Sequence, residues 1–103
     1  MKHQILWTPR AKMRLEELAA FLAEKSPPAA ARMVRRVLAG VAHLQHQPQL
    51  GRPWRQDGSE PIRRLILDDH IVYYEQDEGA RLVNILSVRH GKESPVEEGA
   101  PLK

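Results

Sequence analysis

The chain has 103 residues, 42% of them hydrophobic, which favours one domain around one core. It contains no cysteine, which excludes disulfides, thiol nucleophiles and thiolate metal sites. Its net charge of +3, from 16 basic and 13 acidic residues, suits an acidic partner, either nucleic acid or protein, and equally an ordinary soluble surface.

A short strand and a helix are predicted at the beginning of the chain. Residues 3–7, HQILW, have the composition of a strand. Thr8 can accept a hydrogen bond from an unpaired helix amide, and Pro9 loses no needed donor at the first helical position. Apolar residues at helical spacing then predict a helix over about residues 9–25.

A second helix is predicted directly after the first. The Ser-Pro-Pro sequence at residues 26–28 ends one helix and caps the next. The following residues, to about residue 45, carry an apolar stripe with a period of 3.6. Because the connection is so short, the two helices should form an antiparallel hairpin.

The second half of the chain is predicted to be a loop followed by strands. Residues 46–61 hold three prolines and two glycines, which is typical of an irregular loop. Short polar turns separate three apolar segments, residues 62–67, 70–76 and 81–89, which should pair as an antiparallel meander. The last of them is nearly all apolar, so we expect it to be central and covered on both faces.

These elements predict an α+β fold with the order β-α-α-β-β-β, in which a helical hairpin packs on a small antiparallel sheet. We expect residues 1–92 to form a single domain and residues 93–103 to form a flexible tail. Tyr73 and Tyr74 are neighbours on one strand and should face opposite sides of the sheet. One should lie in the core, and the other should bind a partner or pack on the open face.

An ordered set of short motifs spans about residues 4–92. The motifs are Trp7-Thr8-Pro9 with Ala11, Ser26-Pro27 with Ala30, Gly51-Arg52, Arg64-Leu65, Val72-Tyr73-Tyr74, Ile85-Leu86, and Val88 with His90. In this order and spacing they resemble the RelE/ParE superfamily of toxins from type II toxin–antitoxin modules, the ParE-like branch in particular. The resemblance implies a small plasmid-stabilisation toxin. It also implies neutralisation by an acidic antitoxin that folds on the toxin as it binds.

The resemblance leaves three functions open. ParE-like toxins inhibit DNA gyrase without being enzymes, which is the function we expect here. RelE-like toxins are ribosome-dependent endoribonucleases that cut messenger RNA with basic residues and an aromatic residue near the C-terminus. This chain has no tyrosine after His90, and Glu97 and Glu98 would repel a phosphate backbone. A degenerate member that has lost toxicity is the third possibility.

One catalytic arrangement is still compatible with the sequence. His70 begins one predicted strand and His90 ends the next, so an antiparallel pairing brings them together. Two histidines that titrate near neutral pH could act as a general acid and base in RNA cleavage. The alternative, two solvent-facing histidines at strand ends, is favoured. We therefore expect no catalytic residue.

Partner binding is expected on a basic surface. The candidate residues are Arg52, Trp54, Arg55, Arg64, Arg89, His90 and Lys92. Arginine suits carboxylates and phosphates, and Trp54 is either an interface anchor or a cover for the core. For Arg52, beside Gly51, a role in fixing the loop is favoured over binding.

The remaining expectations concern surroundings and ligands. No long apolar run is present, so we expect neither a signal peptide nor a membrane contact, and a cytoplasmic location. We expect no metal and no cofactor. The expected partners are the antitoxin and DNA gyrase, without direct sequence-specific binding of nucleic acid.

Overall fold

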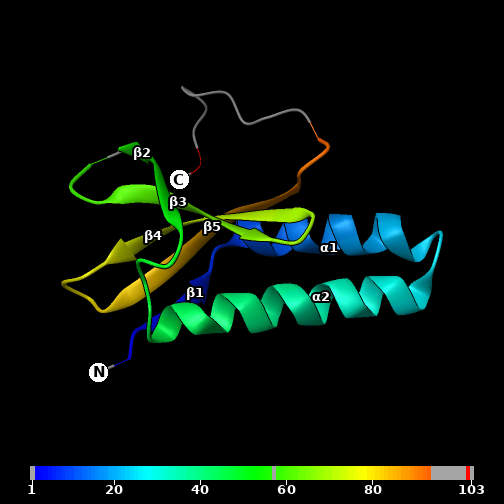
Figure 1. The fold of residues 1–103 in the computed structure, drawn as a ribbon, viewed down its shortest axis with the longest axis horizontal. Coiled ribbons are helices and arrows are strands. Elements are labelled where there is room, and N and C mark those ends of the chain that lie inside the picture. The colour runs from blue at the N-terminus through cyan, green and yellow to red at the C-terminus, as the bar shows by residue number, and fades with distance from the viewer. Residues whose placement is uncertain (1, 57, 94–101, 103) are drawn as a thin grey trace.

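The computed structural model describes residues 2–56, 58–93 and 102, and it places two helices against a five-stranded sheet (Figure 1). The elements in chain order are β1 (Gln4–Trp7), α1 (Pro9–Ala23), α2 (Pro27–Ala42), the short 3₁₀ helix η1 (His43–Gln45), β2 (Arg52–Gln56), β3 (Pro61–Leu67), β4 (His70–Asp77) and β5 (Leu82–His90). The α+β fold class is confirmed. No helix within the described ranges is long and apolar enough to cross a membrane.

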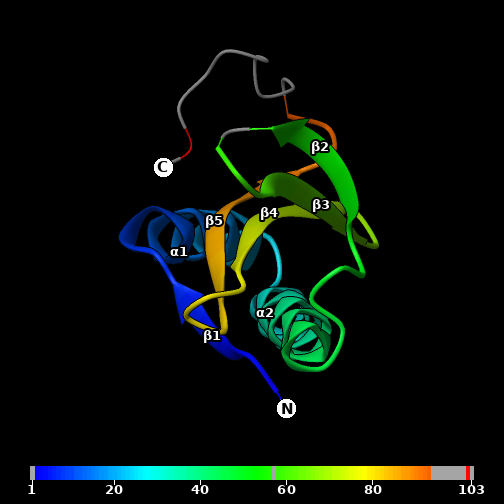
Figure 2. The ribbon, with the colours of Figure 1, turned by 90° about the vertical axis from the view of Figure 1, so that its left-hand side faces the viewer.

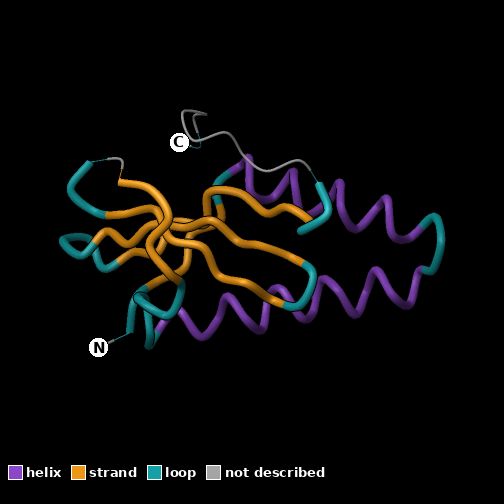
Figure 3. Tube along the Cα trace, turned by 45° about the horizontal axis from the view of Figure 1, so that its top comes forward, coloured by secondary structure: helices purple, strands orange, loops and turns teal. Residues whose placement is uncertain are grey.

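The helical hairpin forms as predicted from its caps. The Thr8 hydroxyl accepts a hydrogen bond from Ala11 N–H at 3.2 Å, and the Ser26 hydroxyl accepts one from Ala29 N–H at 3.3 Å. Each cap is followed by proline in the first turn of its helix. The helices run antiparallel, and the tip of the hairpin projects beyond the ends of the strands (Figure 3).

The sheet has the strand order β1-β5-β4-β3-β2, which can be followed in Figure 2. Strands β3, β4 and β5 form the predicted antiparallel meander, with β5 inside the sheet. Strand β1 pairs in parallel with β5, so the sheet is mixed. The prediction of an irregular loop over residues 46–61 was wrong for residues 52–56, because these form β2. Pro53 is tolerated there because β2 is an edge strand whose register with β3 shifts between Pro53 and Arg55, and sheet edges and bulges are where a strand can hold a proline.

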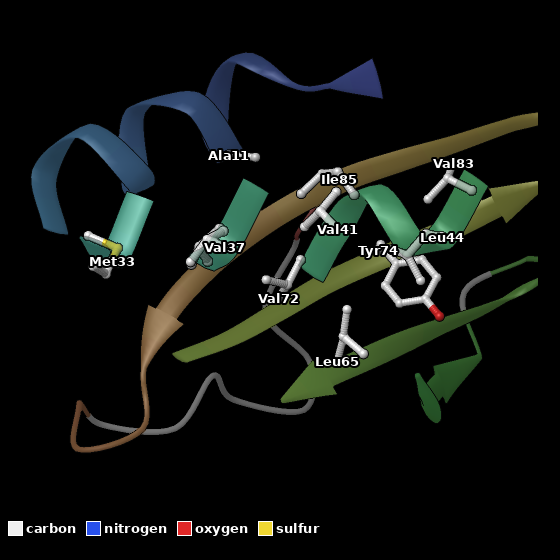
Figure 4. Packing of buried hydrophobic residues seen from close by; sticks show 11 residues of the cluster. Ala11, Met33, Val37, Val41, Leu44, Leu65, Val72, Tyr74, Val83 and Ile85 are labelled. Carbon is white, nitrogen blue, oxygen red and sulfur yellow. The ribbon is translucent and has the colours of Figure 1, made fainter. Parts of the chain in front are cut away.

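The main core lies between the hairpin and the sheet (Figure 4). Helix α2 presents Met33, Val37 and Val41 to this core, all of them buried. From the sheet, Val72 and Tyr74 of β4 meet them, and both are fully buried. Burial of an aliphatic side chain of this kind contributes about 1.5–3 kcal/mol.

A second, smaller cluster covers the opposite face of the sheet. Tyr73, Ile62 and Leu86 form it with Leu102, and Trp54 packs against it. The two tyrosines therefore face opposite sides, as predicted, and Tyr73 packs within the fold at 1% exposure. Apart from Glu93 and Leu102, the predicted flexible tail at residues 93–103 lies outside the described residues.

Candidate functional site

A groove of about 700 Å³ lies between α1 and the end of the sheet where β4 begins and β5 finishes. The end of β5 lies beside α1 in Figure 1. The apolar part of the lining comes from Leu18, Phe21 and Leu22 of α1. The charged and polar residues that line the groove are Arg14, Glu17, Lys25, Asp69, His70, His90, Lys92 and Glu93.

His70 and His90 stand side by side in this groove. They are register partners across β4 and β5, with ring centroids 5.1 Å apart and one ring edge-on to the other. Val72 and Val88 are also register partners and lie in the main core, so the two histidines continue that face by the two-residue alternation of a strand. The predicted proximity of the two rings is confirmed.

Burial lowers the pKa of His70, and the neighbouring His90 lowers it further. The carboxylates of Asp69, Glu93 and Asp68 oppose this without reversing it. His70 is therefore neutral at neutral pH and can accept a proton. The Lys92 backbone N–H donates to His90 Nδ1 at 3.0 Å, so the neutral His90 ring carries its proton on Nε2.

An ion pair closes one side of the groove. Arg14 Nη2 lies 2.7 Å from Glu93 Oε1 and 2.9 Å from Glu93 Oε2, and Arg14 Nε donates to Val88 O at 3.1 Å. The His90 backbone N–H donates to Glu93 Oε1 at 2.7 Å. Burial alone would raise the pKa of Glu93, but the hydrogen bonds from His90 N–H and Arg14 outweigh it and lower the pKa. Arg14 and Glu93 thus tie the chain after β5 to α1.

The candidate residues on β2 and β3 lie apart from the groove. Arg52 and Arg64 are register partners, and Arg64 pairs with Tyr73, which is further along β4 than His70. Trp54 is half-buried, and its ring centroid lies 4.9 Å from that of Tyr73. The Arg55 guanidinium lies over the Trp54 ring, 5.0 Å from the centroid. Trp54 therefore packs over the smaller cluster, and its role as an interface anchor stays a prediction.

Arg89 is the candidate residue whose side chain is most engaged in hydrogen bonds within the fold. It is 9% exposed and lies on the face of the sheet away from the helices. Its Nε donates to the Tyr73 hydroxyl at 2.9 Å, and Nη1 donates to His90 O and Glu93 O at 3.1 and 3.2 Å. These bonds hold the turn after β5, so the predicted basic surface divides into the β2–β3 arginines and the groove residues His90 and Lys92.

In the described part of the chain, two side chains hold the Gly51 corner. Gly51 N–H donates to the Tyr74 hydroxyl at 2.8 Å, and Arg63 Nη1 donates to Gly51 O at 2.9 Å. Arg52 is exposed. Among the described residues, Tyr74 and Arg63 therefore fix the corner that Arg52 was expected to fix.

Sequence reasoning missed Arg14, Phe21 and Glu93 as parts of the site. Of these three, Phe21 could have been found from the sequence, because it lies off the centre of the apolar stripe of α1 and should therefore be exposed. It is 61% exposed. Arg14 and Glu93 are separated by most of the chain, so their contact depends on the packing of α1 beside β5.

Comparison with known proteins assigns the family. The family model described as the ParE toxin of the type II toxin–antitoxin system, parDE, matches residues 5–95. The chain is 39% identical over 89 residues to Y4kP of Sinorhizobium fredii, a protein whose name designates it as a candidate toxin; the match covers 86% of this chain and 88% of the relative.

Solved structures share the fold. The chromosomal ParDE toxin–antitoxin system from P. aeruginosa matches with a TM-score of 0.71 at 20% identity, covering 86% of this chain and 96% of that one. The archaeal RelE–RelB complex from Pyrococcus horikoshii matches with a TM-score of 0.64 at 17% identity, covering 91% and 100%. With the family match spanning nearly all of the described fold, the chain belongs to the ParE toxin family of type II toxin–antitoxin systems.

Proposed function

We propose that this ParE-type toxin inhibits DNA gyrase and thereby blocks replication, without catalysing a reaction itself. The family match over residues 5–95 is the observation that carries this proposal. The contacts of two arginines support it, one in the groove and one on the opposite face of the sheet. Arg14 is paired with Glu93, and Arg89 is bonded to Tyr73. An enzyme that cuts RNA needs cations that can hold the reacting phosphate, and these two are already engaged within the fold.

We also propose that a cognate antitoxin neutralises the toxin. The solved relatives are described as toxin–antitoxin complexes, which supports a partner of that kind here. An acidic segment suits the chain's net charge of +3. Such a segment could fold as it binds, either on the groove or along an open sheet edge at β1 or β2.

A ribosome-dependent endoribonuclease is the second candidate function, and one observation favours it. The rings of His70 and His90 lie 5.1 Å apart in a groove, and the pKa of His70 is lowered, which suits a general base. The tautomer of His90 leaves a proton on Nε2 that could be donated. The aromatic residue expected in that branch is absent after His90.

Inducible expression in a bacterial host tests these functions together. We expect replication to stop and DNA breaks to appear while messenger RNA stays intact. The double variant H70Q/H90Q should remain toxic, as should the control H46Q, because His46 is an exposed histidine outside the groove. Transcripts cut within codons by the parent and left intact by H70Q/H90Q would instead establish the endoribonuclease. Normal growth with well-folded protein would point to a degenerate member.

A further inference from the structure

The charge of the groove depends on its two histidines. Among the described residues that line it, Arg14, Lys25 and Lys92 are balanced by Glu17, Asp69 and Glu93. The groove is therefore close to neutral when both histidines are neutral, and it becomes positive only when a histidine takes up a proton. Its attraction for an anion should consequently depend on pH in the range where histidine titrates.

The two rings differ in the atoms that they can offer to an anion. The Lys92 backbone N–H donates to Nδ1 of His90, so the neutral His90 ring offers Nε2–H as a donor. Protonation of His70 would add a second, positively charged donor beside it. Burial and the adjacent His90 both disfavour a positive charge on His70. An anion bound between the rings would offset both effects by its attraction to that charge.

The carboxylates near His70 offset only part of the cost of a positive charge on its ring. Glu93 is already paired with Arg14, and Asp68 is paired with Arg36 of α2 at 2.7 Å. Arg32 and Arg36 of α2 line a smaller groove on the other side of His70 and add positive charge there. Asp69, next to His70 in the chain, favours the protonated ring, yet the pKa of His70 remains lowered.

We propose that the His70–His90 end of this groove is a proton-dependent binding site for a carboxylate of an acidic protein partner. The carboxylate accepts hydrogen bonds from protonated His70 and from His90 Nε2–H, and one proton is taken up for each carboxylate bound. The identity of the partner as the antitoxin rests on the proposed function. The site itself rests on the geometry of the two rings.

The apolar lining favours a protein segment over a nucleic acid. Leu18, Phe21 and Leu22 can bury an apolar side chain next to the carboxylate. Phe21 is 61% exposed, with the Lys25 ammonium 4.9 Å from its ring centroid, so an aromatic surface and a cation lie together. A nucleic acid would bring several phosphates past Glu17, Asp69 and Glu93, which also line the groove, whereas an acidic side chain brings a single negative charge beside an apolar neighbour.

A titration of the full chain by NMR tests the proposal. The pKa of His70 is measured from its ring signals in chloride, acetate, butyrate and inorganic phosphate at equal ionic strength. We expect butyrate to raise the pKa of His70 most and acetate less, because each methylene that the groove buries strengthens binding roughly fourfold. Butyrate affinity should increase as the pH falls through the pKa of His70.

Matched variants separate the site from general effects. H90Q should raise the pKa of His70 in chloride, since it removes the adjacent ring, and should weaken the response to butyrate. F21A should reduce the butyrate response to that of acetate, while H46Q should behave as the parent. A His70 pKa equal in chloride and butyrate would overturn the proposal, and a larger response to phosphate would reassign the site to phosphate groups. These results do not depend on toxicity, so failure of the gyrase proposal is recognised separately.

Discussion

Replacing Tyr74 with phenylalanine tests how the Gly51 corner is held. The Tyr74 side chain is fully buried, and its hydroxyl accepts the Gly51 N–H at 2.8 Å. Phenylalanine keeps the ring but leaves a buried backbone N–H without this partner. An unsatisfied buried donor costs about 1–3 kcal/mol, so Tyr74→Phe should lower the free energy of unfolding by that amount.

Gly51→Ala disturbs the same corner by a different route. A Cβ at residue 51 would lie 2.6 Å from Arg64 O, 2.8 Å from Tyr74 Cε1 and 2.9 Å from the Tyr74 hydroxyl. Contacts this short force either the β3 backbone or the Tyr74 ring to move, which costs about 1–3 kcal/mol. Because the movement also breaks the Gly51–Tyr74 hydrogen bond, the double variant should be less destabilised than the sum by about 1 kcal/mol.

Urea unfolding of the four proteins in this cycle gives the comparison directly. Arg52→Ala is the matched control, since Arg52 follows Gly51 and is exposed, and its effect should stay within about 0.5 kcal/mol. The reasoning is refuted if Tyr74→Phe is as stable as the parent. It is equally refuted if Arg52→Ala is the more damaging change, because Arg52 would then hold the corner.

Three further predictions concern the groove and the core. A double-mutant cycle with Arg14→Ala and Glu93→Gln should give a coupling of about 0.5–1 kcal/mol that weakens in salt, since the side chains are 24% and 41% exposed; no coupling would mean that the pair does not close the groove. The pKa of His70 is lowered from 6.5 on folding, so the unfolded chain binds more protons and stability should fall as the pH drops below about 6.5. In His70→Gln, unfolding measured between pH 7 and the folded pKa should lose this slope, and an unchanged slope would assign it elsewhere. Val37→Ala should cost about 2 kcal/mol in thermal or urea unfolding, because Val37 is 1% exposed in the main core, and a negligible cost would contradict the packing of α2.

Local signals in the sequence predicted the helices and the meander, because capping and periodicity act over a few residues. The Thr8 and Ser26 caps are examples. Strand β2 was missed because Pro53 argues against a strand. The edge position and the register shift that make this proline acceptable are properties of the whole sheet. The burial of His3 could not be predicted for the same reason, because its ring lies against Gln76 and Glu78, which are far away in the sequence.

The candidate site was predicted in part for the same reason. His70 and His90 meet because strand pairing follows from short turns, which the sequence displays. Arg89 was expected on a binding surface, but strand alternation points its side chain at Tyr73. Its burial was not predicted, because a charged side chain is ordinarily exposed. The Arg14–Glu93 pair required the docking of α1 beside β5, which no local pattern specifies.

Gyrase supercoiling in vitro tests the central claim most directly. Purified toxin is added to DNA gyrase, ATP and relaxed plasmid, with heat-unfolded toxin and an unrelated topoisomerase as controls. We predict that the folded chain inhibits supercoiling or traps cleaved DNA, that H70Q/H90Q does so equally, and that a cognate antitoxin reverses the effect. Full supercoiling activity at excess toxin, together with cutting of messenger RNA on ribosomes by the same preparation, would contradict the account.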